Sequence, residues 1–143
     1  MEYRFDHERL EVYRVAREFN GQLSGLLTRV QRGQAESRDN LARAGKSITR
    51  NIAEGAGKWT VKDKIHFYHI ARASATECAA GLDELLDYGL ASPEQIEPLK
   101  TTLGRIVAML IAMIRSLESR KERTMDRAPT PSPRDPGNGQ MQP

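Results

Sequence analysis

Apolar residues recur at spacings of three and four along most of the chain, which is the period of one face of an α-helix. Four such segments follow one another, at about residues 6–30, 37–56, 60–89 and 92–123. No segment alternates apolar and polar residues as a half-buried strand does. Since long helices joined by short loops pack as antiparallel neighbours, the sequence predicts an all-α, up-down-up-down four-helix bundle.

Residues of the types that cap or stop helices flank these segments. The predicted N-caps are Asp6, Thr60 and Ser92, and the last two are followed three residues later by an acidic residue or a glutamine, as in a capping box. Glycines mark the ends of the first two helices, at Gly33 and Gly55. The predicted helix boundaries therefore have a local chemical cause.

The composition changes at residue 126. The stretch 126–143 contains five of the seven prolines and almost no large apolar side chain. Such a segment cannot bury enough surface to offset the entropy lost on ordering. We predict a four-helix bundle domain at 1–125 and a disordered, Pro/Gly-rich tail at 126–143.

The last two helical segments carry more apolar surface than one bundle requires. The run 106–114 is apolar on all sides of its helix, which predicts burial on every side. In the third segment, Phe67, Ile70, Ser74 and Gly81 form a second face, where small residues would let another backbone approach. Because no helix of a four-helix bundle is surrounded by the others, this surplus predicts self-association. The alternative is that the last helix is central in one tight bundle.

Charge is unevenly distributed, although 22 Lys and Arg against 19 Asp and Glu give a net charge of only +3. Residues 43–64 hold six basic and two acidic residues, whereas residues 83–97 hold five acidic residues and no basic one. An antiparallel bundle would place these segments at opposite ends, so we predict a basic end that attracts phosphate backbones, with Trp59 beside it suited to stacking on a base. The alternative is that these charges only solvate the surface. The predicted phosphate contacts are Arg43, Lys46, Arg50, Lys58, Lys62 and Lys64.

No combination of residues points to catalysis. His66 and His69 are three residues apart but lack a third ligand, and Asp63 with His66 supplies only half of a di-iron set. Cys78, the single cysteine, excludes a cysteine-cluster metal site and is predicted to fill the core. Ser47 has no local base to activate it. We predict no catalytic residue, no metal and no cofactor.

Neither a signal peptide nor a membrane span is indicated. The N-terminal ten residues contain no apolar run, and the longest apolar run is far shorter than the roughly 20 residues that cross a bilayer. We therefore expect a cytoplasmic protein without a membrane partner.

Two stretches resemble the signature of a known family. Residues 47–55 read Ser-Ile-Thr-Arg-Asn-Ile-Ala-Glu-Gly and residues 70–77 read Ile-Ala-Arg-Ala-Ser-Ala-Thr-Glu. This resembles the four-helix bundle proteins encoded in intervening sequences of bacterial 23S ribosomal RNA genes, and the likeness covers about residues 8–120. The positions that match the signature are Ser47, Asn51, Glu54, Gly55, Ser74 and Glu77. Considered alone, the polar stripe that includes Ser47, Asn51 and Glu54 favours a structural role in capping or bridging helices.

The resemblance implies a homopentamer and kinship with the accessory variability determinant proteins of diversity-generating retroelements, which are basic pentameric barrels that bind nucleic acid and a reverse transcriptase. It implies no catalytic residues, and it leaves open whether the signature residues support assembly or contact a ligand. Two functions follow as hypotheses. The first is a non-enzymatic, oligomeric protein that binds RNA through a basic surface, and the alternative is a scaffold that recruits a protein such as a reverse transcriptase without touching nucleic acid.

Overall fold

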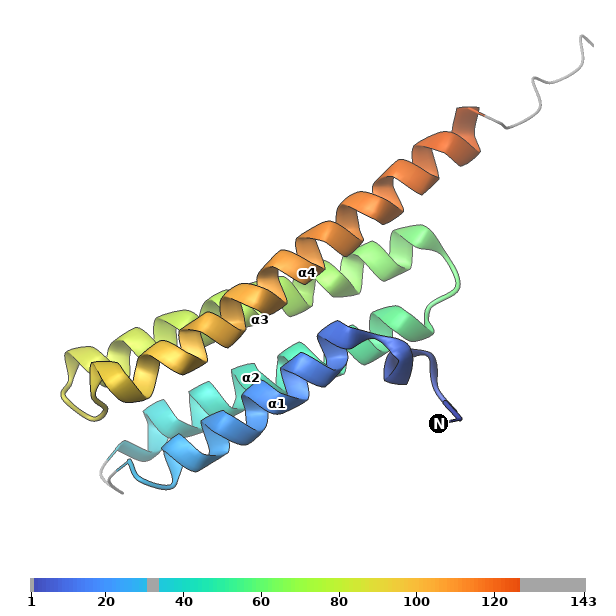
Figure 1. The fold of residues 1–143 in the computed structure, drawn as a ribbon. Coiled ribbons are helices and arrows are strands. Elements are labelled where there is room, and N and C mark those ends of the chain that lie inside the picture. Colours follow the sequence, from blue (N-terminus) through green and yellow to red (C-terminus); the bar gives the residue numbers. More distant parts are fainter. Residues whose placement is uncertain (1, 31–33, 127–143) are drawn as a thin grey trace, which may run out of the picture.

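The computed structural model describes residues 2–30 and 34–126, and these residues form helices without a strand (Figure 1). This confirms an all-α fold with four α-helices. The predicted helix exit at Gly33 and the predicted tail lie outside the described residues, apart from Asp126 at the end of the last helix. The elements are η1 (Asp6–Arg9, a 3₁₀ turn), α1 (Glu11–Leu27), α2 (Ala35–Gly57), α3 (Val61–Asp87) and α4 (Pro93–Asp126).

The helices lie lengthwise beside one another, with α2 on α3, α3 on α4, and α1 on both α2 and α4. Figure 1 shows the α2–α3 turn at the same end of the molecule as the N-terminal segment and η1. The α3–α4 turn lies at the other end, where α1 also finishes. We call these the η1 end and the opposite end. At the η1 end, α4 continues beyond the start of α3 (Figure 1).

A single hydrophobic core lies between the four helices. Most of its largest fully buried side chains come from the apolar stripes that the sequence predicted, because each stripe turns toward the other helices. In α3 the predicted stripe includes Leu86, but Leu86 is exposed and Leu85 is buried instead. The core side chains include Phe19 and Leu23 of α1, Ile48 and Ile52 of α2, Leu82 and Leu85 of α3, and Ile106 and Leu110 of α4.

None of the helices in residues 2–30 and 34–126 has the length and hydropathy needed to cross a membrane.

Two of the three predicted N-caps are confirmed. Thr60 Oγ1 accepts a hydrogen bond from the Asp63 amide at 3.1 Å. Ser92 Oγ accepts from the Gln95 amide at 3.2 Å, and the Gln95 side-chain oxygen accepts in return from the Ser92 amide at 2.9 Å. α3 ends as predicted near Gly89, whose φ of +69° favours glycine.

The predicted N-cap at Asp6 is wrong. Asp6 begins the 3₁₀ turn, and α1 starts only at Glu11, after an extended Leu10 whose side chain cannot cap. The turn is held by contacts that helical periodicity does not reveal: the Glu8 carboxylate accepts from the Arg4 amide at 3.0 Å, and the His7 ring packs on neighbouring aromatic rings.

The apolar run of α4 is not buried on every side within one chain. Ile106, Leu110 and Ile114 are buried in the core, whereas Ala108 and Ala112 are exposed on the outer face. The outer face of α4 therefore carries two small apolar residues, with the exposed Arg105 and Arg115 one turn to either side. This departure from the prediction arises because α4 contacts helices on one side only.

The second face of α3 is covered by α2 of the same chain. Ser74 is buried, with its Oγ 2.7 Å from Ser47 Oγ, and a Cβ placed on Gly81 would lie 2.8 Å from the Leu41 side chain. The small residues thus allow another backbone to approach closely, as expected. The inference that this backbone belongs to another copy is wrong for Ser74 and Gly81.

Cys78 is fully buried on α3 and belongs to the core, as predicted. Burial, with a smaller contribution from the Glu77 charge, raises the pKa of its thiol to about 12. A thiol becomes a nucleophile or a metal ligand as the thiolate, which this environment disfavours. The position argues against a catalytic cysteine.

Candidate nucleic-acid interface

Three signature residues form a hydrogen-bonded cluster between α2 and α3. Ser47 Oγ lies 2.7 Å from Ser74 Oγ across the two helices. The Asn51 side-chain amide donates to the Ser47 backbone oxygen at 2.8 Å and to Ser47 Oγ at 3.0 Å. Because partly buried hydroxyl and amide groups need such partners, this geometry agrees with a bridging role for Ser47, and Asn51 supports Ser47 from within α2.

Gly55 and Glu77 also contact the neighbouring helix. Gly55 is buried, and a Cβ there would lie 2.7 Å from Cε1 of the Tyr68 ring. Glu77 pairs with Arg43 at 3.1 Å across the same helices, although both side chains are more than half exposed. Such an exposed pair contributes little stability. Four of the six signature residues therefore join α2 to α3, whereas Asn51 bonds to Ser47 within α2 and Glu54 pairs with Lys58.

Three of the six predicted phosphate contacts have partners within the chain. Arg43 is held by Glu77, and Lys58 pairs with Glu54 at 3.8 Å. The Lys64 ammonium donates to two carbonyls in the last turn of α2, at 2.8 and 3.3 Å. Since those carbonyls lack helical partners, Lys64 caps α2. For Lys64 the geometry assigns a structural role.

The other three predicted contacts, Lys46, Arg50 and Lys62, are exposed. Within residues 2–30 and 34–126 none of them takes part in an ion pair. Lys46 faces α1 toward the opposite end, in a hollow of about 530 Å³ that also includes Arg38. Arg50 and Lys62 lie toward the η1 end, so the structure does not bring all six cations together.

Arg50 lines a hollow of about 450 Å³ at the η1 end, together with His7, Glu54 and Lys58. His7 was not among the predicted site residues. In the sequence, His7 is marked only by its position between the aromatic residues Phe5 and Tyr13. Its approach to α2 depends on the extended backbone at Leu10, which the spacing of apolar residues does not predict. Within this hollow the charges of Lys58 and Glu54 neutralise each other, so Arg50 is the cation that remains available to bind an anion.

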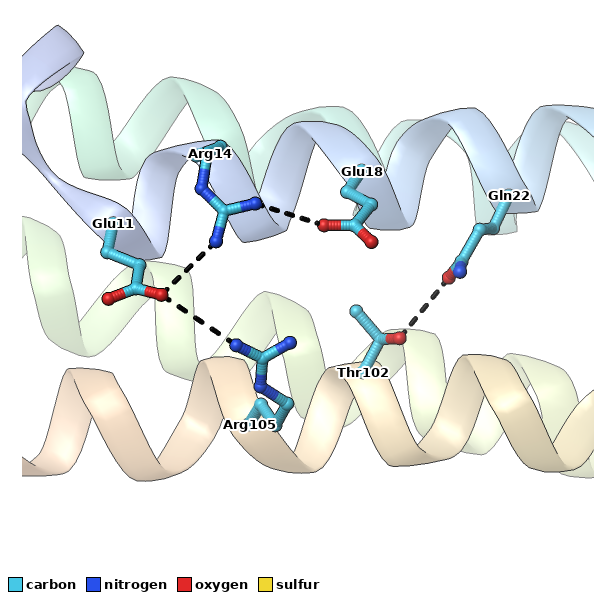
Figure 2. Close-up of polar contacts among 6 residues, drawn as sticks. All are labelled: Glu11, Arg14, Glu18, Gln22, Thr102 and Arg105. Carbon is cyan, nitrogen blue, oxygen red and sulfur yellow. Dashed lines mark hydrogen bonds and ion pairs between the residues drawn. The ribbon is translucent and has the colours of Figure 1, made fainter.

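The polar contacts between α1 and α4 engage further arginines (Figure 2). Arg14 donates to Glu11 at 3.1 Å, and Arg105 approaches the same carboxylate at 3.8 Å. Beside them, the Thr102 hydroxyl donates to the Gln22 side-chain oxygen at 3.2 Å. The contacts of Arg105 and Thr102 link α4 to α1, whereas that of Arg14 lies within α1, and both arginines are already paired with a carboxylate.

Five acidic residues fall in the last turns of α3 and the first turns of α4, and Figure 1 shows this α3–α4 turn at the opposite end. One of them, Asp83, accepts from Lys100 at 2.7 Å. Among the described residues, no group of three or more His, Cys, Asp or Glu side chains is arranged to hold a metal ion. The two ends therefore differ in charge, and the acidic residues are Asp83, Glu84, Asp87, Glu94 and Glu97.

Comparison with known proteins agrees with the fold. Residues 8–112 match the 23S rRNA-intervening sequence protein family, which is well over half of the chain. A crystal structure from Bacteroides thetaiotaomicron, described as a protein of unknown function from the S23 ribosomal protein family, is similar with a TM-score of 0.66 and 24% identity. The similarity covers 72% of this chain and 97% of that one, and at this identity it supports the fold alone. No curated protein matches the chain.

Proposed function

The chain belongs to the 23S rRNA-intervening sequence protein family, and from this premise we propose that it is a non-enzymatic, homo-oligomeric bundle that binds RNA. The observation that carries the proposal is the pair Arg50 and Lys62, which are exposed and outside any ion pair at the η1 end of the described chain. The non-enzymatic part is supported by Cys78, which is buried, and by Ser47, which is held by Asn51 and Ser74. The cytoplasmic location stays a prediction.

Phosphate binding follows from the chemistry of these side chains. A guanidinium such as that of Arg50 donates to a phosphate through two parallel N–H groups, and an ammonium such as that of Lys62 acts as a point charge. Binding releases the cations condensed on the nucleic acid, so the affinity falls as salt is added. Acidic residues at the opposite end would orient the protein with its η1 end toward the RNA.

Reversing the Arg50 charge is expected to weaken RNA binding by about tenfold or more. The slope of log affinity against log salt concentration should also decrease by about one, since about one fewer counterion is released on binding. Arg50→Glu is compared with Arg29→Glu, an exposed residue near the opposite end, where the same change should have little effect. Fluorescence anisotropy with a labelled, structured RNA at several salt concentrations measures both quantities. Equal losses for the two variants, or no binding by the wild-type protein at low salt, would contradict the proposal.

Self-association is the second part of the proposal, and the outer face of α4 supports it. Ala108 and Ala112 are exposed there, beside the half-buried Val107 and Ile111. Small residues in a row let a second helix approach closely, and an apolar row facing solvent is unfavourable in a monomer. We infer that antiparallel, up-down-up-down bundles assemble through this face, and the family resemblance implies five copies in a ring.

A carboxylate on this face is expected to break the assembly. Ala112→Glu should convert the oligomer into a monomer of 16.1 kDa, because assembly would have to bury a charged and much larger side chain where two helices approach closely. Ala35→Glu, an exposed alanine in the first turn of α2, is the matched control and should leave the mass unchanged. Light scattering after size exclusion measures both. A monodisperse wild-type monomer at micromolar concentration would refute self-association.

The alternative function is a scaffold that recruits a protein. A different surface favours it: Leu86 and Tyr88 are exposed beside the acidic residues of the opposite end, so a basic partner with an apolar contact would fit there. A partner that stays bound after nuclease treatment and is lost in a Tyr88→Ala variant would support the scaffold. Loss of the partner with nuclease would support RNA binding.

A further inference from the structure

Exposed aromatic side chains gather at the η1 end. In the described residues, Tyr3 is 47%, Phe5 62% and Trp59 98% exposed, and the remaining exposed aromatic ring is Tyr88 at the opposite end. Tyr3 and Phe5 precede η1, and Trp59 lies in the α2–α3 turn. Single exposed rings are common on protein surfaces, but several at one end of the molecule, near cations outside any ion pair, form a surface that a ligand can cover.

Phe5 is held in place by a row of rings that begins on α1. The His7 ring meets Tyr13 edge-on at 4.5 Å between centroids, with an angle of 69°. Phe5 stacks on His7 at 5.8 Å and 18°. One face of Phe5 is therefore supported by the protein while the side chain remains mostly open to solvent. This arrangement holds the ring ready to stack on another flat group.

Hollows lie on both sides of His7, and each contains a cation outside any ion pair. The first holds Arg50, as described above. The second measures about 520 Å³ and is lined by Tyr3, His7 and Tyr13, with Arg17 at its edge. In the described part of the chain Arg17, like Arg50, has no ion-pair partner. Both volumes lie in the range of sites for small ligands, which is large enough for a nucleotide.

The second hollow also contains charges that are already engaged. Arg14 is paired with Glu11 and Glu18. The Glu8 carboxylate accepts the Arg4 backbone amide at 3.0 Å, which holds the segment before η1 in place and leaves one negative charge at this hollow. Arg17 is thus the guanidinium that a bound anion would meet, with the rings of Tyr3 and Tyr13 beside it.

Rings and free guanidiniums side by side match the chemistry of an unpaired nucleotide, which offers a flat base and a phosphate together. In a double helix each base is already stacked on its neighbours, so a duplex presents mainly its phosphates and riboses. We propose that the η1 end binds single-stranded RNA, with bases stacked on Phe5 and Tyr3 and phosphates held by Arg17 and Arg50. This inference rests on the proposed RNA binding and specifies the form of RNA that is bound.

Two RNA probes test the inference: a labelled single strand of about 12 nucleotides without self-complementarity, and the same strand annealed to its complement. The wild-type protein should bind the single strand more tightly. Phe5→Leu and Tyr3→Leu should each weaken single-strand binding by about tenfold and leave duplex binding unchanged. Phe5→Tyr, which keeps a stacking ring, should retain the affinity. Tyr88→Leu, which removes an exposed ring at the opposite end, is the matched control and should have no effect.

Trp59 gives an independent readout, because it is the single tryptophan of the chain and is almost fully exposed at the η1 end. Its fluorescence should be quenched by the single strand more than by the duplex. Equal affinity for both RNAs, together with unchanged binding by Phe5→Leu and Tyr3→Leu, would overturn the inference while an Arg50→Glu effect still supported RNA binding. If the wild-type protein binds neither RNA at low salt, the proposed function fails as well.

Discussion

Replacing Gly55 with alanine is expected to destabilise the bundle by about 1–3 kcal/mol, in spite of the higher helix propensity of alanine. The new Cβ would lie 2.7 Å from Cε1 and 2.9 Å from Cδ1 of the Tyr68 ring, and 3.2 Å from the Phe67 Cβ. Tyr68 is buried, so its ring cannot swing into solvent to make room. α2 and α3 would have to separate where they pack most closely. Urea denaturation followed by circular dichroism measures the loss.

Gly21→Ala is the matched control, because Gly21 lies inside α1 with nothing within 4 Å of an added Cβ. There the propensity of alanine acts alone, and we expect stabilisation by about 0.5–1 kcal/mol. The two substitutions should therefore have opposite signs. If Gly55→Ala also stabilised the protein, contact with Tyr68 would not be the reason for glycine at this signature position.

Raising the pH from 9 to 12 is expected to unfold the protein, because two buried groups resist ionisation in the folded state. Burial, together with the smaller influence of Asp6, raises the pKa of Tyr68 from 10.0 to about 12. Burial likewise raises the pKa of Cys78 from 9.0 to about 12. Above these ordinary values the unfolded chain loses protons that the folded chain keeps. The stability from both groups is complete below pH 9 and is lost as the pH rises toward 12, at up to about 1.4 kcal/mol per pH unit for each group.

Substitution of tyrosine by phenylalanine separates this effect from the titration of surface lysines. Tyr68→Phe keeps the ring against Gly55 and removes the ionisable hydroxyl, so the free energy of unfolding should fall less steeply above pH 10. Tyr88→Phe, at a largely exposed position, should leave the slope unchanged. Urea unfolding at pH 8 to 11 gives the slopes. Identical slopes for the Tyr68 variant and the wild-type protein would rule out a protonation link at Tyr68.

Local signals predicted the fold well and the candidate site only in part. Thr60 and Ser92 were predicted as caps because a cap bonds to an amide three residues away. Asp6 was not a cap because the start of α1 depends on how His7 packs against Tyr13. Arg50, Lys62 and Lys64 were all predicted as phosphate contacts, but only Arg50 and Lys62 are exposed, whereas Lys64 caps α2.

The four helices and most of the faces that they bury follow from the amino-acid sequence, because the spacing of apolar side chains and the capping of helix ends are local properties of the chain. Which cations remain available depends instead on how the helices pack. The pairing of Arg43 with Glu77 joins residues on different helices, and its presence depends on how α2 packs on α3. The same holds for the η1 end, where the extended Leu10 brings His7 beside Arg50 and Phe5 stacks on His7. The sequence gives the charged and aromatic residues, but which of these side chains lie close together depends on the packing of the helices.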